Sequence, residues 1–341
     1  MLTHARSGLR ILSRTPQELP PLRHDSRARL SRGRNSSDLM IISTFSIVAA
    51  DPPAGEVGVA VQSKYLAVGA VVPWARAGVG AVATQAMGFA GFGPRILDAL
   101  SHGQSPQVAM EAALATDRMA AHRQVGVVSA SGQSASHTGA ECMAWAGGVT
   151  AATYAAQGNI LAGEAVVREM ARAFETASGP LVKRLLTALE AAQAAGGDKR
   201  GEQSAALIVE QSGYAEATGL RIDRMIDLRV DDHPHPIAEL RRLLDLRLRQ
   251  EVSFRAMRPY YDADYARAAA IMAEGARAYP DSAEILYNLA CFESMAGEAD
   301  ESLRHLAQAL DVDPAMRPMA ATDSDFDPVR ADARFAALLK P

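Results

Sequence analysis

The order of short apolar runs and amphipathic stretches between residues 44 and 210 is the feature that most constrains the fold. The apolar runs 44–50 and 57–61 flank the turn Asp51-Pro-Pro-Ala-Gly55, which is typical of a β-hairpin. Further strands are expected at 67–72, 79–84, 124–129, 134–137, 153–156 and 204–210. Helices are expected within 93–115, at 162–177 and at 180–195. This order predicts an α+β domain in which helices pack on sheets.

The pattern changes to helix after residue 231. The segment Asp231-Asp-His-Pro-His-Pro236 is typical of a linker, because its prolines and paired acids disfavour both helix and strand. Pro280 and Pro314 are 34 residues apart, which is the tetratricopeptide period. With that period, Leu289, Ala290, Leu306 and Ala309 fall at core positions between helices. We therefore expect a linker over 231–237 and an all-α, tetratricopeptide-like helical domain over 238–341.

The first 39 residues have a different composition. They contain eight arginines, no lysine and three acidic residues, and they show no sustained apolar period. Such a segment is typical of a disordered basic extension, and an organellar transit peptide or a basic arm would have the same composition. Met40 opens the first patterned segment, so either Met1 or Met40 can be the true start. The first folded domain is expected over 40–230.

Composition excludes several classes of protein. The formal net charge is −4, which gives no basic field for nucleic acid or an anionic membrane. The sequence contains no run of about 18 apolar residues, which is the length that a membrane-spanning helix needs. Two distant cysteines cannot build a disulfide scaffold or a cysteine zinc site. Walker, G-x-S-x-G, H-E-x-x-H and EF-hand motifs are lacking. We expect a soluble cytoplasmic protein with no metal, no cofactor, no nucleic-acid partner and no membrane partner.

Three polar clusters interrupt the apolar strands. They are Gln62-Ser63-Lys64, Gln157-Gly158-Asn159 and the segment 198–204, which contains Asp198 and Arg200. The chain has only four lysines, and a lysine directly after a buried strand must either reach solvent or serve a site. Asn159 can offer an amide N–H to an oxyanion. His137 ends a strand, where a hydrogen-bonded turn and a catalytic role are both open. Taken alone, each cluster is also consistent with a structural role.

Taken together, these motifs resemble the domain-of-unknown-function 1028 family. The resemblance covers residues 44–230 and rests on Thr44-Phe-Ser-Ile-Val-Ala49, Gly58-Val-Ala-Val-Gln-Ser-Lys64, Gly78-Val-Gly-Ala-Val-Ala-Thr-Gln85, His137-Thr-Gly139, Gln157-Gly-Asn159 and Ala195-Gly-Gly-Asp-Lys-Arg-Gly-Glu-Gln-Ser-Ala-Ala206. It implies a four-layer αββα fold of the N-terminal-nucleophile (Ntn) hydrolase type. The helical tail looks like an accessory module.

The resemblance also implies a mechanism. In Ntn hydrolases the first residue of the mature chain attacks an amide, and its own α-amino group takes the proton. Thr44 occupies that place, and Ser63, Lys64 and Asn159 complete the expected catalytic set. His137, Gln157, Asp198 and Arg200 are the expected substrate-binding residues. Thr44 and Ser63-Lys64 are opposite ends of one hairpin, so they should lie together with Asn159 around one cavity.

Residues precede Thr44 whichever methionine starts the chain, so three functions stay open. The leading hypothesis is an amidohydrolase of small amides or peptides, which requires cleavage at Ser43–Thr44. The second is a catalytically silent binding or scaffold module, whose helical repeats dock a protein partner or form a homo-oligomer. The third is a non-hydrolytic enzyme on the same fold.

Overall fold

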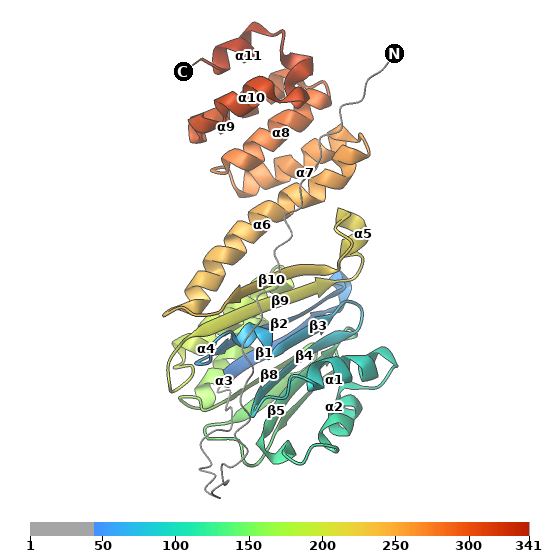
Figure 1. Cartoon of the computed structure of the whole chain (residues 1–341), viewed down its shortest axis with the longest axis vertical. Coiled ribbons are helices and arrows are strands. Elements are labelled where there is room, and N and C mark those ends of the chain that lie inside the picture. Colours follow the sequence, from blue (N-terminus) through green and yellow to red (C-terminus); the bar gives the residue numbers. More distant parts are fainter. Residues whose placement is uncertain (1–43, 341) are drawn as a thin grey trace, which may run out of the picture. The chain divides into compact units, whose positions relative to one another are not determined.

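The computed structural model describes residues 44–340, which form an α+β arrangement with two antiparallel sheets and a C-terminal helical region (Figure 1). The expected basic extension over 1–39 lies outside the described residues. The six-stranded sheet has the order β10 (Arg224–Val230), β9 (Ser204–Gln211), β2 (Glu56–Ser63), β1 (Thr44–Asp51), β8 (Tyr154–Asn159) and β7 (Gly147–Ala151). The four-stranded sheet has the order β3 (Pro73–Arg76), β4 (Gly80–Ala86), β5 (Arg123–Ser129) and β6 (Ser134–Thr138).

Both faces of strand β1 are buried, which explains its nearly continuous apolar sequence. Phe45 and Ile47 pack in one apolar core with helices α3 (Glu164–Thr176) and α4 (Leu181–Ala194). Val48 belongs to a second core between the two sheets. Because side chains alternate along a strand, Thr44 and Ser46 share the inter-sheet face with Val48.

A third core lies on the other face of the four-stranded sheet. There Val82 and Val125 pack against helices α1 (Phe92–Ser101) and α2 (Pro106–Leu114). Each helix pair therefore covers the sheet face that does not meet the other sheet (Figure 1). The α+β class expected from the sequence is confirmed.

The expected hairpin is present, and other expectations need correction. Strands β1 and β2 are antiparallel neighbours that pair from Thr44 opposite Ser63 to Asp51 opposite Glu56. The run 67–72 is not a strand, because Ala67 has a left-handed backbone with φ of 55° and starts a 3₁₀ turn over Val68–Ala70. Strands β3, β7 and β10 and the short helix α5 (Tyr214–Thr218) were not expected.

The helical region begins with a long helix that contributes to two cores. Helix α6 (Pro236–Tyr261) starts at the end of the expected linker. Its Leu240 and Leu244 belong to the core of the six-stranded sheet, whereas its Ala256 belongs to the core of the following helices. Those helices are α7 (Tyr265–Ala278), α8 (Ala283–Met295), α9 (Ala299–Val312), α10 (Arg317–Thr322) and α11 (Ala333–Leu338). Over the described residues, the structure has no helix with the length and apolar character of a membrane span.

Candidate functional site

Three polar side chains line up across neighbouring strands where β1 begins. Thr44 lies opposite Ser63 of β2 on one side and opposite Asn159 of β8 on the other. All three are buried, and the Thr44 hydroxyl donates a hydrogen bond to Ser63 Oγ at 3.2 Å. The short hairpin turn sets this register, so residues at the two ends of the hairpin become neighbours. Three of the four expected catalytic residues are therefore close together.

Two glutamines of the opposite sheet complete this cluster. Gln85 of β4 donates from Nε2 to the carbonyl oxygen of Thr44 at 3.3 Å and to Gln124 Oε1 at 2.8 Å. The same Gln124 oxygen accepts from Asn159 Nδ2 at 3.0 Å. Because this oxygen is the acceptor, Nε2 of Gln124 is the donor, and it reaches Thr138 Oγ1 at 2.9 Å. A chain of hydrogen bonds thus links Asn159 to strand β6.

Gln157 lies in the same inter-sheet layer, two residues before Asn159. Its Nε2 donates to Ser46 Oγ at 2.8 Å, and Ser46 in turn donates to Gln85 Oε1 at 2.7 Å. Gln157 is fully buried, yet its Oε1 has no hydrogen-bond partner among the described residues. This expected substrate-binding residue therefore keeps one acceptor free close to Thr44.

Asp198 ties a loop to the end of strand β2. Its carboxylate accepts the backbone N–H of Lys64 at 3.1 Å and that of Arg200 at 2.9 Å, and it forms an ion pair with Arg200 at 3.2 Å. Asp198 also forms an isolated β-bridge with Leu161, just beyond β8. Asp198 and Arg200 accordingly lie at the same end of the sheet as Ser63 and Asn159.

Two expected residues do not join the cluster through their side chains. The Lys64 side chain is exposed, and its ammonium group donates to the carbonyl oxygen of Glu202 at 3.0 Å. His137 pairs with Val125, whose side chain packs against α1 and α2, so it faces away from the inter-sheet layer. Its Nε2 lies 3.1 Å from the carbonyl oxygen of Ala120.

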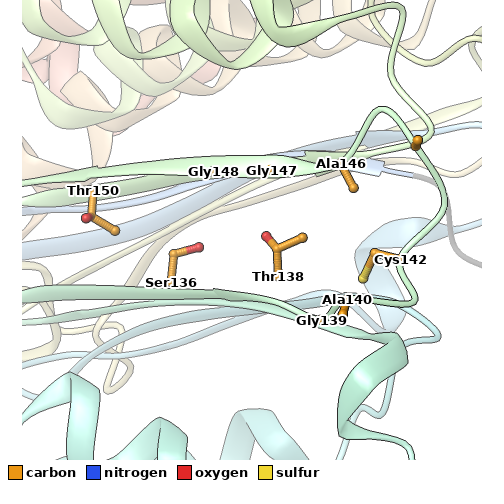
Figure 2. A pocket seen from close by; sticks show the side chains of 10 residues that line it. Ser136, Thr138, Gly139, Ala140, Cys142, Ala146, Gly147, Gly148 and Thr150 are labelled. Carbon is orange, nitrogen blue, oxygen red and sulfur yellow. The ribbon is translucent and has the colours of Figure 1, made fainter.

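A cavity of about 520 Å³ lies where β6 and β7, the edge strands of the two sheets, meet (Figure 2). Ten residues line it: Ser136, Thr138, Gly139, Ala140, Cys142, Ala144, Ala146, Gly147, Gly148 and Thr150. None of the site residues expected from the sequence is among them. Burial raises the pKa of the Cys142 thiol, so the thiol is protonated at neutral pH. Cys142 is therefore a weak nucleophile here.

Sequence reasoning missed Ser46, Gln85 and Gln124. The signal was present, because each is a polar residue inside or at the end of an apolar strand at a position of the inward-facing period. Their importance depends on which strands face each other across the two sheets, and a single sequence does not reveal that stacking.

Comparison with known proteins identifies a family and a similar solved structure. The family of unknown function DUF1028 matches residues 44–240. The crystal structure of a protein from Silicibacter pomeroyi, described as a member of the same family, is similar with a TM-score of 0.54 and 33% identity. That similarity covers 60% of this chain and 85% of the other. No curated protein matches the chain.

Proposed function

The chain belongs to the DUF1028 family, and on that premise we propose that its sheet domain is an N-terminal-nucleophile amidohydrolase of small amides or peptides. The observation that carries the proposal is the place of Thr44. It is the first residue of a central strand, and its hydroxyl is hydrogen-bonded to Ser63 of the next strand. Two facing antiparallel sheets with helices on their outer faces support the four-layer Ntn-type fold as part of this proposal.

The proposed reaction uses the Thr44 hydroxyl as nucleophile. Once Thr44 is the first residue, its neutral α-amino group takes the hydroxyl proton while Oγ1 attacks the substrate carbonyl carbon. The resulting tetrahedral oxyanion needs a hydrogen-bond donor, and the side-chain amide of Asn159, on the strand beside Thr44, is the donor that the proposal assigns. The leaving amine then takes the proton from the α-ammonium group. Water hydrolyses the acyl ester by the same proton path and restores Thr44.

Thr44 must first acquire a free amino group. Ser43 precedes it in the chain, so the proposal requires cleavage of the Ser43–Thr44 peptide bond. Gln85 holds the Thr44 carbonyl oxygen, and Ser63 holds the side chain. These contacts fix the nucleophile on both sides of its Cα, which reduces the entropy lost when the substrate is attacked.

The decisive experiment compares chains that begin at Thr44. Such a chain is produced by cleaving a removable tag, together with its Thr44→Ala, Thr44→Ser and Thr176→Ala variants, and turnover is measured on a panel of small amides and dipeptides. We expect turnover in the parent and the exposed-threonine control Thr176→Ala, partial turnover in Thr44→Ser, and none in Thr44→Ala. Equal turnover in Thr44→Ala and the parent would contradict the proposal, as would no turnover in any of them.

One observation favours the binding-module function as a second candidate. A groove of about 460 Å³ is lined by residues of α7, α8 and α9, and it combines apolar Leu286 and Leu289 with charged Arg277 and Arg304. A tetratricopeptide-like module would dock a peptide there. Selection of a random peptide library on the wild type and on Arg277→Glu tests this function, since only the wild type should enrich sequences. The absence of any enriched sequence would contradict it.

A further inference from the structure

The cavity between β6 and β7 has the geometry of a ligand site. The side chains of Ser136 and Thr138 project from β6 and that of Thr150 from β7 into the gap between the two strands (Figure 2). The volume of about 520 Å³ lies in the range of small-molecule pockets. None of the ten lining residues carries a charge, and the largest of their side chains are threonines.

One buried oxygen atom in the wall of this cavity, Ser136 Oγ, lacks a hydrogen-bond partner among the described residues. The fully buried Gln157, on the next strand inward, does not line the cavity, and its unpartnered Oε1 lies against Gly126 of β5, where a Cβ would be 2.2 Å from it. Gly148 pairs with Gln157, and a Cβ at Gly148 would lie 3.0 Å from Ser136 Oγ and 3.2 Å from Gln157 Cβ. Glycine at position 148 therefore keeps open the space beside Ser136 Oγ.

The hydrogen-bonding capacity of these groups matches an amide. Thr138 Oγ1 accepts from Gln124, so its own hydroxyl hydrogen remains for a ligand carbonyl oxygen. The Ser136 hydroxyl, which lacks a partner among the described residues, can either accept from a ligand N–H or donate to a ligand oxygen. None of the lining residues offers a counter-charge, so a charged ligand would lose part of its hydration here without gaining an ion pair. The small lining residues leave room for a peptide backbone with small side chains.

We propose that this cavity binds an uncharged short peptide or amide with small side chains, as the part of the substrate remote from the scissile bond. This inference rests on the proposed hydrolase function. Strand β7 is two strand spacings from β1, or about 10 Å. That distance equals about three extended residues, so the substrate class is a tripeptide-sized amide. The contacts from Thr138 through Gln124 to Asn159 connect the cavity with the Thr44 cluster.

The test separates binding from turnover. N-acetyl-trialanine amide, which is uncharged, is titrated by calorimetry into the full chain carrying Thr44→Ala, and then into the same chain with Thr138→Val or Thr138→Ser added. We expect binding in the parent, about tenfold weaker binding with Thr138→Val because one buried hydrogen bond is lost, and near-parent binding with Thr138→Ser. A probe with aspartate as its middle residue should bind at least tenfold more weakly. Gly148→Val should abolish binding without lowering the melting temperature as strongly as a core substitution.

The outcomes distinguish this inference from the proposed function. Binding that depends on Thr138, combined with no turnover by a chain beginning at Thr44, would support the cavity and overturn the hydrolase. A second outcome is turnover by that chain at rates that do not change with Thr138→Val and do not differ between neutral and acidic peptides. This outcome would overturn the cavity inference and would not contradict the hydrolase function. No binding of the neutral probe would also overturn the inference.

Discussion

At the scale of single residues, the site is built from neutral polar groups that satisfy one another. Gln124 is fully buried, accepts from Gln85 and Asn159, and donates to Thr138 and to the carbonyl oxygen of Gly158. Burying one such amide alone would be unfavourable, whereas a network with mutual partners fixes the side-chain orientations. The same network holds the two sheets in one relative register.

We therefore expect Gln124→Leu to destabilise the fold. It leaves the amides of Gln85 and Asn159 without their shared acceptor, and one unsatisfied buried polar group costs about 1–3 kcal/mol. A urea titration should show a free energy of unfolding lower by about 2–4 kcal/mol in total. Gln107→Leu removes an exposed glutamine and should change it by less than about 0.5 kcal/mol. Equal small effects of both substitutions would contradict the assigned role of Gln124.

Glu56, at the start of β2, provides a pH-dependent prediction. Burial and, next, the charge of Asp51 raise the pKa of Glu56 above its ordinary value of 4.5, and its Oε2 has no partner among the described residues. The folded state thus binds the proton more tightly than the unfolded state. The stabilising contribution is complete below pH 4.5 and is lost as pH rises through the folded-state pKa.

Glu56→Gln removes the charge that is unfavourable at neutral pH. We expect its melting temperature to exceed that of the wild type at pH 7, with a difference that shrinks toward pH 4 as the wild-type carboxyl becomes protonated. Calorimetric scans of both proteins across this pH range measure the difference. A difference that grows on acidification would show the opposite sign of the pKa shift.

At the scale of elements, a strand could be predicted where its own residues and the adjoining turn favour a strand. The β1–β2 hairpin was predictable because a short Pro/Gly turn joins two apolar strands, and its register brought Thr44 to Ser63. Strand β7 was missed because its sequence Gly-Gly-Val-Thr-Ala has low strand propensity. Strand β10 was missed because its edge position tolerates the charges of Arg224, Asp227 and Arg229.

The direction of the Lys64 side chain was not predictable, because it depends on a contact with a loop that is distant in the sequence. The loop over 198–202 returns to the end of β2 through Asp198 and offers the Glu202 carbonyl oxygen to the lysine ammonium group. This contact joins residues more than a hundred positions apart. A sequence pattern defines the strand end, but the loop that meets it is a tertiary feature.

The packing of helices α8 and α9 yields an element-scale prediction. Ala290 is fully buried, and its carbonyl oxygen accepts a hydrogen bond from Ser302 Oγ at 2.8 Å, so the two helices approach closely. Ala290→Leu should overpack this contact and lower the free energy of unfolding by about 1–3 kcal/mol. Ala270→Leu, at an exposed position of α7, is the control and should have little effect. Unfolding followed by far-ultraviolet circular dichroism measures both, and an unchanged helical transition in Ala290→Leu would contradict the packing.

At the scale of the whole molecule, one continuous helix belongs to two cores. Partly buried Leu248 is the last residue of α6 that packs with the core of the six-stranded sheet, and partly buried Val252 is the first that packs with the core of the helical region. Exposed Gln250 lies between them. Unfolding one core therefore frays the helix that stabilises the other, and we expect the described residues to unfold in a single cooperative transition.

Breaking the helix at this junction should separate the two cores. Proline at position 250 removes the hydrogen bond to the carbonyl oxygen of Leu246 and clashes with it, at a cost of about 3 kcal/mol or more. Neither core loses a side chain, because Gln250 is exposed. We expect differential scanning calorimetry to resolve two transitions in Gln250→Pro and one in both the wild type and Gln250→Ala, which keeps the helix intact. Two transitions in the wild type would show that the cores are not coupled. A single transition in Gln250→Pro would show that α6 does not couple them, because interrupting the coupling helix should divide the unfolding.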